Sequence, residues 1–175
     1  VPGAFLRDLA NVLNEADQVS LAVTPTRVIA RCGAVTLAAL PLSGPFPEYD
    51  AIVPRPTEAT PALVCDRATL EHALRAVAVI ARENAQTVSV RWADGDVHLT
   101  AQAAETGHAQ GGLQGRTVGE IEVRMNAHFF ADAVAAIPGE RVRVSVHDPK
   151  RPIRVEPETA SNDLQQLAVI MPVLA

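Results

Sequence analysis

Cysteine and basic side chains are both scarce in this sequence. Among its 175 residues only Cys32 and Cys65 are cysteines, and they lie far apart in apolar, strand-like segments. Such cysteines are typical of buried thiols in a reducing compartment, and not of a disulfide framework. The formal net charge is −5, so the surface as a whole does not attract nucleic acid, which argues against a tight, sequence-reading DNA binder. Any DNA contact must therefore come from a local basic face.

Long apolar runs and catalytic motifs are also lacking. No apolar run approaches membrane-spanning length, and no signal peptide is visible. Gly111-Gly112-x-x-Gly115 lacks the Gly-Lys-Ser/Thr of a phosphate-binding loop, so we interpret it as a turn. The histidines are dispersed without metal-ligand spacing: His72, His98, His108, His128 and His147. We therefore expect no metal, no other cofactor and no enzymatic activity.

One enzyme hypothesis stays open at this point. Cys65 and His72 are close in sequence, as a thiol nucleophile and its base would be. Such a pair needs a third group that orients the base, and no such group stands out. An unrelated α+β enzyme with a site centred on Cys65 therefore remains an alternative, and thiol alkylation would test it.

The residues that are present form a weak internal repeat of one helix followed by alternating strands. The spacing of apolar residues predicts three helices, over Gly3 to about Ala16, Asp66 to Ala81, and Asn126 to Ile137. In the first, Leu6, Leu9 and Leu13 are expected to form the apolar stripe. Asp66 and Asn126 are suitable N-caps for the other two.

Strands with a period of two follow each helix. The sequence predicts first strands at 19–23, 88–92 and 142–146, second strands at 27–31, 97–101 and 153–156, and third strands at 34–40, 106–113 and 167–171. Further strands at 62–65 and 120–125 precede the second and third helices. The pattern predicts an α+β fold with antiparallel sheets and helices on one face, built from repeated strand-helix-three-strand units.

A proline-rich connector divides the chain. Residues 41–61 carry six prolines, which makes this a stiff spacer and not a flexible linker. We predict one domain portion over residues 1–54, with the connector, and a domain over residues 55–175. The first copy of the repeat has almost nothing before its helix, and the chain begins Val1-Pro2-Gly3 without Met, so we expect a fragment or a processed product.

Two apolar motifs stand out. Phe46-Pro-Glu-Tyr-Asp-Ala-Ile-Val-Pro54 places an aromatic pair among prolines, and Val169-Ile-Met-Pro-Val173 lies near the C-terminus. With Met125-Asn-Ala-His-Phe-Phe130 and Arg151-Pro-Ile-Arg-Val-Glu156 between them, they occur in the order found in the bacterial DNA polymerase III β subunit, the sliding clamp. The chain resembles the C-terminal half of that family. It departs from the family pattern at Phe129, usually Tyr, and at Leu174-Ala175, usually Arg-Leu.

The resemblance implies a non-catalytic processivity factor. In this family two chains close a ring around duplex DNA, which they hold without reading its sequence. Residues 1–54 would be the back half of the middle domain, and residues 55–175 the third domain. The partners implied are DNA polymerase III, the clamp loader and repair proteins, with a homodimer formed by the full-length chain. The implied location is cytoplasmic and nucleoid-associated. A stand-alone peptide-binding adaptor that never closes a ring is a further alternative.

The resemblance also implies particular site residues. A hydrophobic pocket for short partner peptides would be formed by Pro47, Ile52, Asn126, Phe129, Val169, Ile170, Met171, Pro172 and Val173. Arginines on two helices would face DNA phosphates: Arg7, Arg67, Arg75 and Arg82. Val79 and Ile80 would belong to the subunit interface. By composition alone, the pocket residues are more typical of ordinary core and edge-strand positions, and Val79 and Ile80 also fit a core. The arginines are as typical of a solvated helix face, interrupted by Glu71 and Asp8.

Overall fold

The computed structural model describes residues 1–175 except 14–17, 47, 58–59, 82–85, 104–106, 160–165 and 175. The chain forms two compact units, Val1–Pro47 and Glu48–Ala175. The expected assignment of residues 1–54 and 55–175 to two particular clamp domains stays a prediction. In the part of the chain that the structure describes, no helix is long and apolar enough to span a bilayer.

The first unit contains α1 (Gly3–Val12) and a three-stranded antiparallel sheet. Its strands are β1 (Val19–Val23), β2 (Val28–Cys32) and β3 (Val35–Ala39), in that spatial order. The buried cluster consists of Phe5, Leu9, Val28 and Ala30. All three strands confirm the sequence prediction, but their core is small.

The predicted apolar stripe on α1 was wrong. Leu9 is buried, but Leu6 is 54% exposed, and Phe5 is buried in its place. Phe5 and Leu9 are four residues apart, so they lie on one face of the helix, and the larger Phe side chain takes the inner position. The helix ends at Val12, because Leu13 adopts an extended conformation. The rest of the expected helix, residues 14–16, lies outside the described residues.

The second unit contains two helices and two antiparallel sheets. The helices are α2 (Arg67–Ala81) and α3 (Ala127–Ala136). One sheet has the order β12-β11-β10-β4-β8, and the other β7-β6-β5-β9. The strands of the first are β12 (Ala168–Ile170), β11 (Ile153–Pro157), β10 (Arg141–Ser145), β4 (Ala62–Asp66) and β8 (Arg116–Val118). Those of the second are β7 (Gly107–Gln114), β6 (Asp96–Ala103), β5 (Thr87–Ala93) and β9 (Ile121–Asn126). The α+β prediction is confirmed.

The two copies of the repeat in this unit exchange their leading strands. β4 directly precedes α2 in sequence but pairs with β10, in the sheet of the other copy. In the same way β9 directly precedes α3 but pairs with β5. Each sheet therefore contains three strands of one copy and the leading strand of the other, and the first sheet adds β8 at the edge beside β4. Neither copy can be removed without breaking the other sheet, so the unit is one cooperative body.

Both predicted N-caps are confirmed. The Asp66 Oδ1 atom accepts hydrogen bonds from the Thr69 backbone N–H at 2.7 Å and from its hydroxyl at 2.6 Å. Asn126 Oδ1 accepts from the backbone N–H groups of His128 and Phe129. These side chains satisfy donors that the first turn of a helix leaves unpaired. Pro138 and Gly139 follow α3, and Gly139 has a φ of +91°, so the helix cannot continue.

Of the turns predicted from the sequence, one is present at the expected residues and another is not. Asp94 and Gly95 both have positive φ, 51° and 91°, as a two-residue hairpin between β5 and β6 requires. The turn predicted over Gly111-Gly112-x-x-Gly115 is wrong for its first four residues, which lie within β7; only Gly115 lies between β7 and β8. β8 and the short helix η1 (Tyr49–Ala51) were not predicted; each spans only three residues, too few to show a period.

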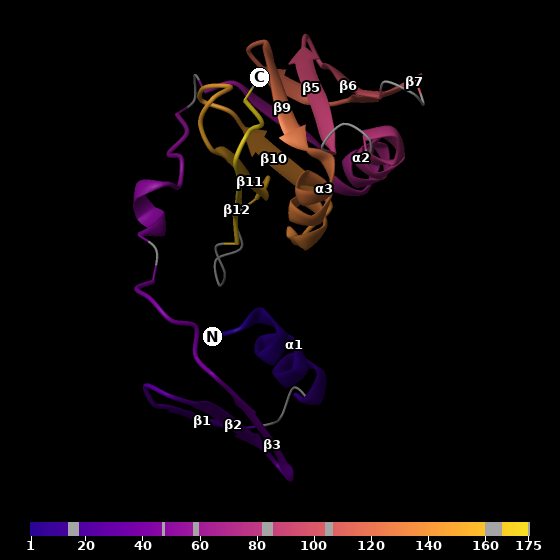
Figure 1. Ribbon diagram of the computed structural model, residues 1–175. Helices are drawn as coiled ribbons and strands as arrows, with labels where there is room; N and C mark the ends of the chain where they lie inside the picture. The colour runs from indigo at the N-terminus through magenta and orange to yellow at the C-terminus, as the bar shows by residue number, and fades with distance from the viewer. Residues whose placement is uncertain are drawn as a thin grey trace. The chain divides into compact units, whose positions relative to one another are not determined.

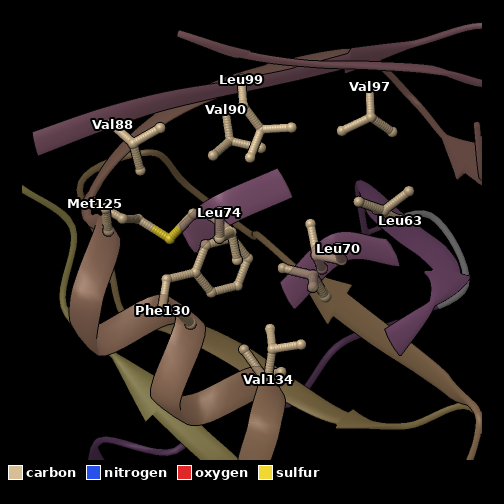
Figure 2. Packing of buried hydrophobic residues seen from close by; sticks show 14 of the residues in the cluster. Leu63, Leu70, Leu74, Val88, Val90, Val97, Leu99, Met125, Phe130 and Val134 are labelled. Carbon is tan, nitrogen blue, oxygen red and sulfur yellow. The ribbon is translucent and has the colours of Figure 1, made fainter. Parts of the chain in front are cut away.

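One large core fills the second unit. Leu70, Leu74, Val77 and Ala81 of α2 are all buried, as the spacing predicted. Figure 2 shows Leu74 beside Phe130 of α3, with Val88, Val90 and Leu99 of the sheet facing them. Packing is close at Gly115, where an added Cβ would lie 2.5 Å from Leu63 Cδ1 and 3.0 Å from the Val64 carbonyl oxygen. Only glycine therefore fits between β7 and β8 without displacing β4.

Candidate functional site

The C-terminal segment is positioned by two hydrogen bonds to the region around α3. Gln166 Nε2 donates to the Ala136 carbonyl oxygen at 3.2 Å, at the last residue of α3. The Val173 backbone N–H donates to the Arg124 carbonyl oxygen at 2.8 Å, two residues before the Asn126 cap. Between these points β12 pairs with β11, and the chain then continues past β9 (Figure 1). The C-terminal segment is thus fixed near both ends of α3, by Gln166 at the last residue of the helix and by Val173 near its N-cap.

Alternation along β12 sorts the predicted pocket residues onto two faces. Ile170 lies opposite Ile153, and both are buried in the core. Val169 pairs with Arg154 on the other face and is half-buried. Met171 is 61% exposed and Val173 is 37% exposed. Ile170 therefore anchors the segment from beneath, while Met171 presents its side chain to solvent.

The connector lies against the outer face of this sheet. Arg154 Nη1 donates to the Pro54 carbonyl oxygen at 3.2 Å, and the same guanidinium binds Glu156 Oε2. Because Arg154 is opposite Val169, this bond holds the connector beside β12. Ile52, 50% exposed, and Met171 line one cavity of about 530 Å³. Its other lining residues are Ala51, Val53, Pro54, Arg55, His147, Arg151 and Pro152.

The start of α3 supplies the remaining predicted residues. Phe129 is 66% exposed on the first turn. The Asn126 amide is already engaged, since its oxygen caps the helix and its Nδ2 donates to Gln86 Oε1 at 3.3 Å. Its place in the peptide pocket stays a prediction, and a hydrogen bond to a peptide would use the second hydrogen of Nδ2. Pro172 is half-buried, and Pro47 lies outside the described residues.

A second cavity adjoins the C-terminal segment. It has a volume of about 590 Å³ and is lined by Glu122, Val123, Arg124, Pro149, Lys150, Val173 and Leu174. The turn before β11 contributes to both cavities, through Pro149 and Lys150 on one and through His147, Arg151 and Pro152 on the other. Sequence reasoning missed these residues. The signal available was the pair Lys150-Arg151, a cluster of charge in a turn that directly precedes a strand of the site.

The arginines assigned to DNA have unequal surroundings. Arg67 is half-buried, donates to the Gly139 carbonyl oxygen at 2.9 Å and forms an ion pair with Glu71 at 3.4 Å. Arg75 is exposed and pairs with the same carboxylate at 3.0 Å. Arg7 is exposed on α1, and Arg82 lies outside the described residues. Glu71 thus offsets part of the positive charge on α2.

The residues assigned to a subunit interface lie near the end of α2. Val79 is 61% exposed and Ile80 is half-buried. A cavity of about 230 Å³ opens between α2 and α3, lined by Arg75, Ala78, Val79, Gln86, His128 and Ala131. An exposed valine at the end of a core helix is available for contact with another surface, and its assignment to an interface stays a prediction.

Cys65 does not have the properties of a nucleophile. It is 1% exposed, and burial, with a smaller effect of the Asp66 charge, raises its pKa to about 12. The thiolate is the reactive form, so this thiol is inert at neutral pH. His72 is exposed on α2, whereas Cys65 is in the core. Among the residues that the structure describes, no three His, Cys, Asp or Glu side chains are placed to hold a metal ion.

Comparison with known proteins decides the family. Residues 54–173 match the family described as DNA polymerase III beta subunit, C-terminal domain. The chain belongs to this family. The beta sliding clamp of Synechocystis sp. is 26% identical over 99% of the chain, and that of Chlamydia muridarum is 25% identical over 98%. A crystal structure of the DNA polymerase III subunit beta from Pseudomonas aeruginosa, 25% identical, superimposes over 99% of the chain with a TM-score of 0.86.

Membership of the sliding-clamp family settles the question of catalysis. Sliding clamps are non-catalytic processivity factors, which contradicts the alternative of an enzyme centred on Cys65. The matches cover 44%, 45% and 46% of the Synechocystis, C. muridarum and P. aeruginosa proteins. The chain therefore spans about half the length of the relatives that it matches.

Proposed function

We propose that this chain contributes the partner-binding part of a processivity clamp, which tethers DNA polymerase III, the clamp loader and repair proteins through short hydrophobic peptides. The observation that carries the proposal is the cavity shared by Ile52 and Met171. These residues are far apart in sequence, each belongs to one of the two apolar motifs, and the Arg154 bond to Pro54 holds their segments together.

The chemistry of this cavity suits an apolar peptide anchor. Methionine is flexible and polarisable, so Met171 can adapt to different side chains. Ile52 and Pro54 supply apolar wall on the connector side. Six of the nine lining residues are apolar and three are polar, and pockets for short peptides likewise combine apolar walls with a few polar groups. Ile170 in the core fixes the backbone on which Met171 is mounted, so the anchor meets a pre-formed surface.

Peptide binding can be tested directly with a matched pair of variants. A fluorescent peptide of the Gln-Leu-x-Leu-Phe type, titrated with the chain, should show rising anisotropy. Met171→Ser should weaken binding by at least roughly tenfold, because burying a Met side chain contributes about 1.5–3 kcal/mol. Val79→Ser is the control, since Val79 is equally exposed at 61% but lies on α2. Equal affinities for both variants would contradict the proposal, as would no binding by the parent.

In a closed ring, we propose, the helices face duplex DNA and contact phosphates without reading sequence. Arg7, Arg67, Arg75 and Arg82 are the residues assigned to this role. The ion pairs of Glu71 with Arg67 and Arg75 leave few cations for phosphate, and the net charge is −5. The chain alone should therefore show no gel shift with linear duplex at physiological salt. A salt-sensitive gel shift at a sub-micromolar concentration of the chain would contradict encirclement as the main source of affinity for DNA.

Ring closure would use Val79 and Ile80 as part of a head-to-tail interface between two full-length chains. The exposure of Val79 supports this assignment. A heterologous interface needs two different patches, so Val79→Glu with Ile80→Glu should abolish dimerisation of a full-length version. Sedimentation at several concentrations measures this, and an unchanged dimer would contradict the assignment.

A further inference from the structure

The cations of the second unit are unevenly paired. Six described arginines form ion pairs with glutamates: Arg67, Arg75, Arg91, Arg116, Arg141 and Arg154. Five described cations of this unit form no ion pair with a described carboxylate: Arg55, Arg124, Arg143, Lys150 and Arg151. All of these but Arg143 line the two cavities beside the C-terminal segment. Unpaired positive charge is therefore concentrated at the proposed peptide site.

The described carboxylates near the two cavities are held by hydrogen bonds or by an ion pair, and only the one paired with Arg154 is offset by a cation; the lining of each cavity nevertheless has more cations than carboxylates. Asp148 Oδ1 accepts the Lys150 backbone N–H at 2.8 Å, which ties this carboxylate to the turn. Glu122, the one acidic residue lining the second cavity, accepts the Ser89 hydroxyl at 2.6 Å. Glu156 is bound by Arg154. No carboxylate lines the first cavity among the described residues. Both cavities therefore present a net positive rim on a chain whose net charge is −5.

We infer that the site selects partner peptides in which acidic residues flank the apolar anchor, and that Arg151 and Lys150 are the specificity-determining residues. The inference rests on the proposed function and names the class of partner for the same site. The apolar anchor would bind between Ile52 and Met171, with Arg55 and Arg151 at the rim. An adjacent carboxylate would bind beside Lys150 and Arg124, along Val173 and Leu174.

The placement of this pair explains why it can act on both cavities. Lys150 and Arg151 are consecutive in one turn, and the turn is fixed by the Arg151 backbone N–H, which donates to the Asp148 carbonyl oxygen at 3.0 Å. Lys150 lines the second cavity and Arg151 the first. A peptide that crosses the Met171–Leu174 segment would pass both cations. Exposed cations of this kind add selectivity and faster association more than raw affinity, and salt weakens their effect.

A double-mutant cycle tests this inference. Two peptides share the Gln-Leu-x-Leu-Phe core and carry flanking Asp-Asp or Asn-Asn, and each is titrated by anisotropy into the parent chain and into Lys150→Gln/Arg151→Gln. The parent should bind the acidic peptide about threefold to tenfold more tightly at low salt, and the variant should lose this preference. Arg143→Gln is the matched control, because Arg143 lines neither cavity and forms no ion pair with a described carboxylate, and it should retain the preference.

The outcomes separate the inference from the proposed function. Equal binding of both peptides by the parent would overturn the acidic preference and leave the peptide site in place. A preference that persists in Lys150→Gln/Arg151→Gln, or that Arg143→Gln also removes, would overturn the assignment to this turn. No binding of either peptide would overturn the proposed function itself. An Asp-Asp peptide in which Ser replaces the two Leu residues and the Phe should not bind. Binding of that peptide would show that general charge attraction, and not a selective site, causes the acidic preference. Trp92 fluorescence, from a fully buried side chain, confirms that each variant is folded.

Discussion

The two units of this chain use the same repeat with different results. In the second unit, β5 and β10 each pair on one side with the leading strand of the other copy, and the core that results extends through both helices and both sheets. In the first unit, the equivalent strand β1 pairs only with β2 among the described residues. Four of its five residues are exposed, including Leu21 and Val23. Among the described residues, β1 is therefore left largely exposed, whereas the exchange of leading strands gives β5 and β10 a partner strand on each side.

The difference also explains where the candidate site is found. A site that binds peptides needs rigid walls, because an ordered surface reduces the entropy lost on binding. Ile170, Ile153 and Val155 fix β11 and β12 from the core side. The first unit, with four residues in its buried cluster, has no comparable support. We therefore place the described part of the site entirely on Glu48–Ala175.

Hydrogen exchange should give the largest contrast between the units. Amides in β1 and β2 are expected to exchange at least about tenfold faster than amides in β5 and β10, because local stability follows the buried contacts that hold each segment. Exchange followed by mass spectrometry on the chain measures this. Equal protection in the two sheets would show that the small core of the first unit is sufficient.

Leu74→Ala should have the largest effect on the stability of the second unit. Leu74 is fully buried at the contact of α2 and α3, and such truncations cost about 2–5 kcal/mol of the free energy of unfolding. Trp92, the single tryptophan, is in the same core and reports the transition in a denaturant titration. Leu6→Ala, at a 54% exposed position of α1, is the control and should leave this transition unchanged.

Gly115→Ala should have a smaller effect in the same unit. The new Cβ would lie 2.5 Å from Leu63 Cδ1 and 3.2 Å from Cys65 Cβ, and overpacking of this kind costs about 1–3 kcal/mol. Gly112→Ala is the matched control, because its Cβ would meet only the Val97 carbonyl oxygen, at 3.6 Å. If both variants unfold at the same denaturant concentration, the close packing of Gly115 against β4 does not restrict which side chain residue 115 can carry.

The smallest expected effect is the change in the loss of stability at acidic pH when Asp66 is replaced. The hydrogen bond from the Thr69 hydroxyl, together with the Thr69 backbone N–H, lowers the pKa of Asp66 below its usual value. The stabilisation from this carboxylate is therefore complete above the unfolded pKa of about 3.9 and is lost as the pH falls through the lower folded pKa. Asp66→Asn keeps a capping oxygen and should reduce the loss of stability in this window. The pKa of Glu158 is also lowered, mainly by the hydrogen bond that it accepts from Arg116. The free energy of unfolding of the variant should therefore still decrease as the pH falls.

Much of the fold followed from periodicity, whereas the candidate site residues came from the family resemblance. Leu70, Leu74, Val77 and Ala81 were placed correctly because a long helix against a large core shows its stripe clearly. The α1 stripe was misplaced because Phe5 and Leu6 are both apolar and the core there is small. Gly111-Gly112 was taken for a turn because a glycine pair is ambiguous without its neighbours; in β7, Gly111 lies against Val77.

The rim of the site could not be predicted from sequence. Lys150 and Arg151 are adjacent in sequence, but nothing local links them to Arg55, and their common location depends on how the connector and the turn before β11 pack around the C-terminal segment. The exchange of leading strands was equally hidden, because β4 and β10 are linked only by long-range pairing. Local patterns specify elements, while long-range packing decides which of their side chains meet.

The most direct test of the central claim is the footprint of a bound peptide. Hydrogen exchange of the chain should be compared with and without a saturating acidic-flanked Gln-Leu-x-Leu-Phe peptide. We expect new protection in three segments of the second unit, namely residues 49–55, 147–152 and 169–174, with no change in β1–β3. Protection confined to α2, or spread evenly over both units, would contradict the placement of the site beside Ile52 and Met171.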